Sequence, residues 1–156
     1  MYTYEHLNNI LNRLFVRMGC TERDAATLSD VLLKAELRGI PSHGLLRLSD
    51  YFRLWESGRI NAKPSIKVIR ETLCTATIDA DRAFGMVAGR YAMEMAIEKA
   101  KKSGTGWVST QNSNHFGIAG YYSMMALEHD MIGITTTNAN PLVAAPLSTS
   151  RLLGTN

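Results

Sequence analysis

The first part of the chain has the apolar spacing that is typical of amphipathic helices. In residues 3–18 apolar side chains recur every three or four positions, after a candidate N-cap at Thr3 and before a stop at Gly19. The same spacing recurs in residues 21–38, where Thr21 is the candidate N-cap. Two amphipathic helices are therefore predicted.

A third helix is predicted from about Gly44 to Trp55, before the polar sequence ESGR ends the pattern. Its apolar face would consist of five residues, namely Leu45, Leu48, Tyr51, Phe52 and Trp55. The chain is thus expected to begin with a helical unit over residues 1–63, with a boundary near Lys63.

After Lys63 the pattern changes to short runs in which β-branched residues alternate with polar ones. Strands are predicted at four such runs: IKVIRE (66–71), CTATID (74–79), GWVSTQ (106–111) and MIGITTT (131–137). Helical spacing is found between them, at residues 86–102 and 118–129. This order predicts an α/β fold class, in which a sheet with packed helices follows the helical unit.

Composition narrows the classes of protein that fit. The chain has 156 residues, of which 46% are hydrophobic, enough for a globular core. Lys and Arg are scattered and the net charge is only +3, so no nucleic-acid partner is expected. We expect neither a signal peptide nor a membrane segment. Cys20 and Cys74 form no CxxC pattern, which argues against a zinc site and favours reduced thiols in the cytoplasm.

The C-terminal sequence RLLGTN stops at Asn156, directly after an apolar pair and a glycine turn. We therefore expect the sequence to be part of a longer protein. The alternative is a natural end in a loop.

The sequence PSHGLLR at 41–47 is the first candidate for chemistry. A helix beginning near Ser42 would place His43 and Arg47 on one face, because residues four apart are neighbours there. A histidine can give a proton to a carbonyl oxygen, and an arginine can hold an adjacent carboxylate. Ser42 can orient the imidazole or relay a proton to it. The alternative is a capping histidine and a solvated arginine.

A second polar cluster, NSNHFGIAG at 112–120, precedes a predicted helix, whose first amides could receive a phosphate. It lacks the first glycine and the following acidic residue of the dinucleotide fingerprint, so dinucleotide binding of the Rossmann type is not expected. His115 has an alternative role as a loop residue bonded to a backbone carbonyl. Asn140, in a third cluster, is a turn residue that can also bind a ligand.

Together these clusters resemble the malate/L-lactate dehydrogenase family, which includes ureidoglycolate dehydrogenase, diketogulonate reductase, sulfolactate dehydrogenase and piperideine-carboxylate reductase. The resemblance is carried by RGIPSHGLLRL, NSNHFGIAGYY, TTNANPLVAAP and LLGTN, in the family's order along nearly the whole chain. It implies a non-Rossmann NAD(P)-binding α/β fold. The helical domain of residues 1–63 would lie beside a mixed sheet, and residues 64–156 would be the first part of the cofactor-binding domain.

The resemblance also implies roles for individual residues. His43 is similar to the family's proton donor and Ser42 to its relay partner. Substrate contacts are implied for Arg47 and Thr155. Contacts with the nicotinamide cofactor are implied for a third group, consisting of His115, Phe116, Gly117, Ile118, Ala119 and Asn140.

On this resemblance the expected function is an NAD- or NADP-dependent oxidoreductase that interconverts a 2-hydroxy acid and its 2-oxo acid. The substrate would resemble malate, lactate or ureidoglycolate, and the enzyme would be a cytoplasmic homodimer. The acidic member of a Ser-His-Asp relay is expected beyond Asn156. Two alternatives stay open: a reductase of cyclic imino acids, and a non-catalytic nucleotide-binding or interaction module.

Overall fold

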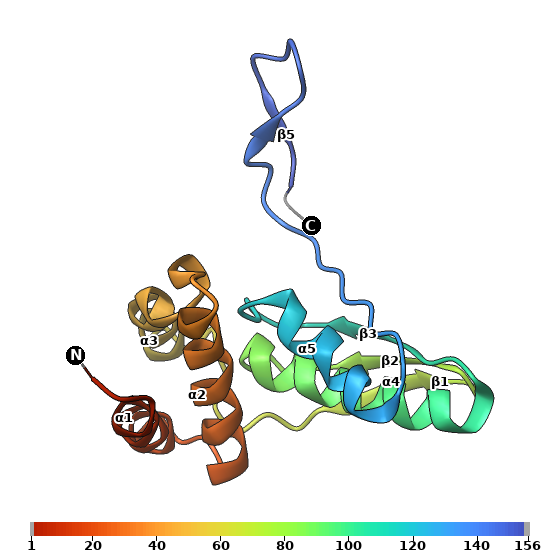
Figure 1. Ribbon diagram of the computed structural model, residues 1–156, viewed down its shortest axis with the longest axis horizontal. Coiled ribbons are helices and arrows are strands. Elements are labelled where there is room, and N and C mark those ends of the chain that lie inside the picture. The colour runs from red at the N-terminus through yellow and green to blue at the C-terminus, as the bar shows by residue number, and fades with distance from the viewer. Residues whose placement is uncertain (1, 155–156) are drawn as a thin grey trace.

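Three helices form the N-terminal part of the computed structural model, which describes residues 2–154 (Figure 1). They are α1 (Tyr4–Arg17), α2 (Glu22–Leu37) and α3 (Leu48–Glu56). The Thr3 hydroxyl accepts a hydrogen bond from the backbone N–H of His6, and the Thr21 hydroxyl accepts one from Asp24. Both predicted N-caps are confirmed, because each satisfies an amide that has no partner within its helix.

The start of the third predicted helix is wrong. Residues 41–47 form two 3₁₀ turns, η1 (Pro41–His43) and η2 (Leu45–Arg47), and α3 begins only at Leu48. Gly44 separates the turns with φ −99° and ψ −138°, which is not a helical conformation. Periodicity alone does not reveal such a break.

The apolar face of α3 is also narrower than expected. Tyr51 is buried, with 1% of its surface exposed, but Phe52 is 38% exposed. Since α3 starts four residues later than predicted, it presents a shorter face to the core, and Phe52 lies at its edge beside Trp55.

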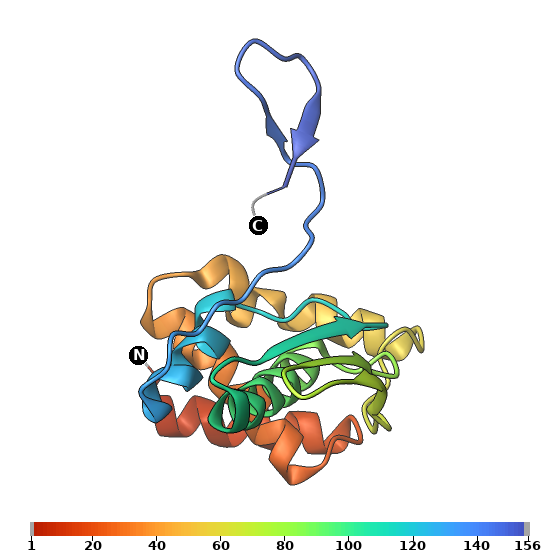
Figure 2. The ribbon, with the colours of Figure 1, turned by 90° about the vertical axis from the view of Figure 1, so that its right-hand side faces the viewer.

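The predicted mixed sheet has the strand order β1-β2-β3. β1 (Lys67–Glu71) pairs antiparallel with β2 (Thr75–Asp79), and β2 pairs parallel with β3 (Trp107–Gln111). The long helix α4 (Gly85–Ser103) connects β2 to β3 and covers one face of the sheet (Figure 2). A crossover helix of this kind is what a parallel strand pair requires.

After β3 a loop leads to α5 (Ala119–Met125), which continues into the 3₁₀ turn η3 (Ala126–His129). The strand predicted at residues 131–137 is wrong: this segment is extended but pairs with no strand in the described part of the chain. Ile132 is 92% exposed there. Alternating apolar and polar residues form a strand only where the edge of a sheet offers hydrogen-bond partners.

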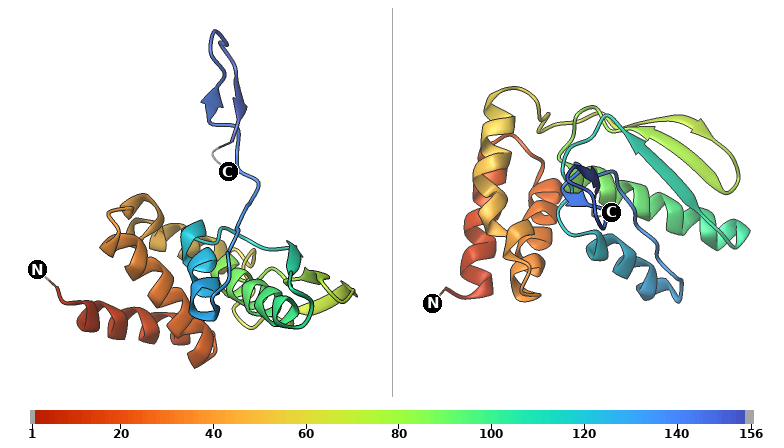
Figure 3. Two further views of the ribbon diagram at one scale, coloured as in Figure 1. Left: turned by 45° about the vertical axis from the view of Figure 1, so that its right-hand side comes forward. Right: turned by 90° about the horizontal axis from the view of Figure 1, so that it is seen from above.

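Residues 131–142 lead to a small hairpin of β4 (Val143–Ala144) and β5 (Arg151–Leu153). The segment of residues 131–154 first runs beside α5, where the Ser123 hydroxyl is 2.9 Å from that of Thr135, and then extends away from the other elements (Figures 1 and 3). We call it the C-terminal arm.

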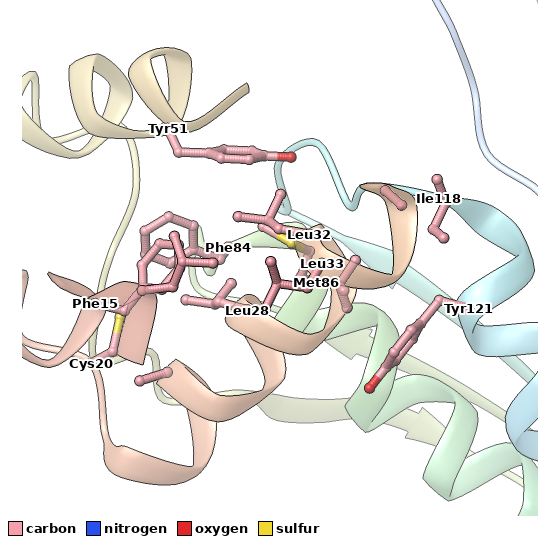
Figure 4. Close-up of a cluster of buried hydrophobic side chains, with 14 of the residues drawn as sticks. Phe15, Cys20, Leu28, Leu32, Leu33, Tyr51, Phe84, Met86, Ile118 and Tyr121 are labelled. Carbon is pink, nitrogen blue, oxygen red and sulfur yellow. The ribbon is translucent and has the colours of Figure 1, made fainter. Parts of the chain in front are cut away.

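One large hydrophobic cluster joins the helices to the sheet region (Figure 4). Its fully buried members come from α1, α2, α3, α5 and the start of α4, and include Phe15, Leu28, Tyr51, Phe84 and Tyr122. The cluster therefore crosses the expected boundary at Lys63. The division into residues 1–63 and 64–156 stays a prediction.

Both cysteines are free thiols. Cys20 is buried, and desolvation raises the pKa of its thiol to about 12, whereas Cys74 is half-buried. Residues 2–154 include no helix with the length and apolar character that crossing a bilayer requires.

Candidate functional site

Ser42 and His43 lie on η1, in the connection between α2 and α3. The Ser42 hydroxyl is 3.0 Å from Nδ1 of His43, so the hydroxyl can fix the orientation of the imidazole. Ser42 is exposed and His43 is half-buried. The pair predicted as proton donor and relay partner is thus in contact.

Arg47, on η2, lies beside this pair. Its Nε donates a 2.9 Å hydrogen bond to the backbone carbonyl of Ser42, and its Nη1 donates a 3.2 Å bond to the carboxylate of Asp50. His43 and Arg47 therefore meet through Ser42 and not, as predicted, on one face of a continuous helix. Asp50 also pairs with Arg53, and the two guanidinium groups hold the pKa of its carboxyl below the usual range.

Glu36, near the end of α2, fixes the backbone of these two turns. Its carboxylate accepts a 2.7 Å hydrogen bond from the backbone N–H of Leu45. The same carboxylate occupies the position that a Cβ atom would take at Gly44. A side chain at position 44 would therefore have to displace the Glu36 carboxylate, and the sequence pattern did not reveal this close approach.

His115 reaches the same place from the loop between β3 and α5. Its ring centroid is 5.4 Å from that of His43, and its Nδ1 is 2.7 Å from the hydroxyl oxygen of Tyr51. Desolvation lowers the pKa of His115, and the positive charges of His43 and Arg47 lower it further. The structure thus brings together two predicted clusters that are about 70 residues apart.

The loop that carries His115 is held on both sides. The Asn114 side-chain amide donates to the backbone carbonyls of Arg82 (3.0 Å) and Ala83 (2.9 Å), just before α4. Phe116 stacks on Tyr122 with ring centroids 5.1 Å apart. His115 therefore projects from a well-anchored segment, although its own side chain is exposed.

The residues expected to contact the cofactor differ in exposure. His115 is exposed, Phe116 and Ala119 are half-buried, and Gly117 and Ile118 are buried. Gly117 and Ile118 can therefore offer only backbone groups to a ligand.

Two predicted residues are not part of this group. Asn140 lies on the C-terminal arm, where no hydrogen bond in the described chain links it to the histidines. Thr155 lies outside the described residues. The candidate site of this chain therefore consists of Ser42, His43, Arg47 and His115.

A hollow between α2, α4 and α5 is lined by mixed charges, including Lys34, Arg90 and Glu128. None of the four site residues lines it.

Gly85→Ala should disturb the His115 loop, because Gly85 lies directly against its backbone. A Cβ atom at Gly85, the first residue of α4, would overlap the backbone carbonyl oxygens of Asn114 and His115. Backbone atoms cannot move aside cheaply, so we expect a loss of about 1–3 kcal/mol in the free energy of unfolding. Urea unfolding followed by circular dichroism measures it.

Gly120→Ala is the matched control, since Gly120 lies in α5 and a Cβ atom there would meet nothing within 4 Å. Alanine favours a helix over glycine, so this variant should be as stable as the wild type or slightly more stable. Equal stability of the Gly85 and Gly120 variants would contradict the close approach.

Comparison with known proteins shows the family to which the chain belongs. The sequence matches the family described as malate/L-lactate dehydrogenase over residues 2–156. The chain belongs to this family. It is 49% identical over 152 residues to a malate dehydrogenase of Pyrococcus abyssi, and 45% identical over 152 residues to an L-sulfolactate dehydrogenase of Methanocaldococcus jannaschii. Each match covers 97% of this chain, but only 42% and 44% of these relatives.

The fold agrees with this membership in the malate/L-lactate dehydrogenase family. The structure of malate dehydrogenase from Pyrococcus horikoshii superposes with a TM-score of 0.92 at 46% identity, covering 97% of this chain and 43% of that one. The non-Rossmann α/β fold implied by the resemblance is thus confirmed. The chain spans about two fifths of the length of the relatives it matches.

Proposed function

We propose that the protein acts as an NAD(P)-dependent oxidoreductase that interconverts a 2-hydroxy acid and its 2-oxo acid. The observation that supports this most strongly is the convergence of His43, His115 and Arg47 in a chain of this family. Two imidazoles and a guanidinium suit a small anion that carries a carboxylate beside a carbonyl or hydroxyl group.

In this proposal His43 exchanges a proton with the substrate oxygen. Its Nδ1 is occupied by the Ser42 hydroxyl, so Nε2 is the atom that faces a ligand. Reduction needs a proton on the oxygen as the carbonyl carbon becomes tetrahedral, and oxidation needs its removal.

Arg47 binds the substrate carboxylate in this proposal. Its present hydrogen bonds use Nε and Nη1, and Nη2 takes part in neither of them. The fork of a guanidinium can therefore still receive a carboxylate while Ser42 and Asp50 hold its stem.

The residues in the middle of the loop between β3 and α5 fit a nicotinamide cofactor. His115 exposes an imidazole and Phe116 is half-buried, so an open polar edge lies next to an aromatic group. When bound, NADH or NADPH would supply the hydride, and the alcohol form of the substrate would return it. The contacts with His115–Ala119, and those with Asn140 and Thr155, belong to the same proposal.

The function is tested with the protein expressed from its full coding sequence. NADH and NADPH are titrated while nicotinamide fluorescence is followed, and oxidation of the reduced cofactor is then measured with several 2-oxo acids. The set includes acids with a second carboxylate or a sulfonate, because the relatives are named for malate and sulfolactate. Binding and turnover support the proposal, whereas binding of neither cofactor favours an interaction module.

A cyclic imino acid is assayed beside the 2-oxo acids. Protonation of an imine nitrogen makes demands on His43 and Arg47 similar to those of a carbonyl oxygen. Turnover of the imine alone would replace the proposed reaction by imine reduction at the same residues.

Arg47→Leu should selectively lower kcat/KM for carboxylate substrates. Loss of the charge-assisted pair with the substrate carboxylate should raise the activation free energy that corresponds to kcat/KM by about 2–4 kcal/mol. The measurement compares a 2-oxo acid with its amide analogue, which should be affected much less.

Arg53→Leu is the matched control for Arg47. It removes the other guanidinium that pairs with Asp50, but the Arg53 side chain is 75% exposed. We expect little effect on kcat/KM from this change. Equal losses for the acid and its amide in the Arg47 variant would contradict the proposed role.

Two further features of the enzyme are proposed from the family resemblance: it is a homodimer, and it is cytoplasmic. The molecular mass measured by light scattering with the full coding sequence tests the first, and fractionation of the native cells tests the second.

A further inference from the structure

Tyr51 links the hydrophobic cluster to the candidate site. Its ring packs near Phe84, with centroids 6.2 Å apart, and only 1% of the residue is exposed. The hydroxyl group points from α3 toward the loop between β3 and α5 (Figure 4). There it lies 2.7 Å from Nδ1 of His115. Burial raises the pKa of Tyr51 far above its ordinary value, so the phenol keeps its proton.

A second contact decides the direction of this hydrogen bond. The backbone N–H of Gly117 is 3.3 Å from the same Nδ1 atom of His115. A backbone N–H can only donate, so Nδ1 is an acceptor and carries no hydrogen. The Tyr51 hydroxyl therefore donates as well. In the neutral imidazole the remaining proton must lie on Nε2.

We propose that Tyr51 is a positioning residue that fixes the neutral His115 imidazole as the Nε2–H tautomer. The Nε2 atom takes part in no hydrogen bond among residues 2–154, and the side chain is exposed. Tyr51 and Gly117 thus leave the single N–H on Nε2, in a ring that lies beside His43. The relevance of this tautomer to catalysis rests on the proposed function. The assignment of the tautomer itself is independent of that function.

The groups around His115 support the neutral form. His43 on η1 and Arg47 on η2 are positive neighbours that disfavour an imidazolium ion, whereas the Asp50 carboxylate on α3 favours it. Partial desolvation also acts against the charge. The Tyr51 hydroxyl acts in the same direction, because its hydrogen bond would be lost if Nδ1 were protonated. A hydrogen-bond donor of fixed position results, suited to an acceptor atom of a bound ligand.

The test is a spectroscopic titration that needs no cofactor or substrate. The protein is labelled with ¹⁵N-histidine, and long-range ¹H–¹⁵N correlation spectra are recorded between about pH 4 and 9, a range centred on the ordinary histidine pKa. His115→Gln identifies the His115 signals among those of the four histidines. In the wild type, the neutral His115 should show a protonated Nε2 and an unprotonated, hydrogen-bonded Nδ1.

Tyr51→Phe removes only the hydroxyl group. The His115 midpoint should then shift to higher pH, and the Nδ1 signal should lose its hydrogen-bond shift. Tyr91→Phe, on α4 and 36% exposed, is the matched control and should leave the His115 signals unchanged.

Three outcomes overturn the proposal: a wild-type His115 with the proton on Nδ1, a mixture of both tautomers in the wild type, or a Tyr51→Phe spectrum identical to that of the wild type. If the Phe variant does not fold, the wild-type spectrum still decides the tautomer. Absence of enzyme activity would contradict the proposed function but leave the spectra unaffected, so the two failures can be distinguished.

Discussion

Replacing His43 by alanine should lower turnover by about two orders of magnitude or more, the range expected for loss of a positioned proton donor. The expectation follows from its contact with Ser42 at 3.0 Å and from its place beside His115. Turnover is measured by oxidation of NADH or NADPH with the best 2-oxo acid, using the full coding sequence. Affinity for the reduced cofactor, followed by nicotinamide fluorescence, should change little.

His129→Ala is the control for this change. His129 ends η3 and is exposed, at the other end of α5 from the candidate site. The same chemical truncation there should leave turnover within the error of the assay. A His43 variant with wild-type turnover would rule out its role as the proton donor, and a parallel loss of cofactor affinity would assign it to binding.

Phe84→Ala should lower the free energy of unfolding by about 3–5 kcal/mol, the usual cost of truncating a buried phenylalanine. Phe84 is 1% exposed, directly before α4, and its ring packs edge-on against Phe15 at 5.8 Å and near Tyr51. Most domains are stable by only about 5–15 kcal/mol, so this variant should lose much of its stability. Urea unfolding measures the difference.

Phe52→Ala provides the comparison, because Phe52 is a phenylalanine of the same chain that is 38% exposed. Its truncation leaves a smaller void and should cost less than Phe84→Ala by about 2 kcal/mol or more. Similar losses for the two variants would mean that Phe84 is not part of the core as the structure describes it.

Local signals were sufficient for much of the fold. Thr3 and Thr21 predict helix starts because a hydroxyl can satisfy the first free amides, and both caps are present. The failures have tertiary causes. The third helix begins late, after a turn in which Glu36 from a preceding helix binds the Leu45 amide and closely approaches Gly44.

The predicted strand at 131–137 failed for a similar reason. Alternation of apolar and polar residues shows that a segment suits a sheet, but hydrogen-bond partners must come from another strand. Ile132 and Ile134 keep the pattern and stay exposed. The alternation therefore predicted a strand for which the described chain provides no partner.

Only the part of the candidate site that lies close together in the sequence was predictable. Ser42, His43 and Arg47 are within six positions of one another, so their proximity follows from the chain itself. His115 was singled out as a loop residue, but its approach to His43 depends on long-range packing. Tyr51 was predicted only as a core residue, since helical spacing says nothing about the direction of a hydroxyl group.

The hydrophobic cluster that crosses Lys63 has a consequence for how the molecule opens. Phe15 of α1, Tyr51 of α3 and Phe84 before α4 share one contact network. Helices α1 and α4 should therefore behave as one cooperative unit, with their slowest amide protons exchanging only through a common global opening. A change in the stability of the N-terminal helices would then change the free energy of opening around His43 and His115 by the same amount.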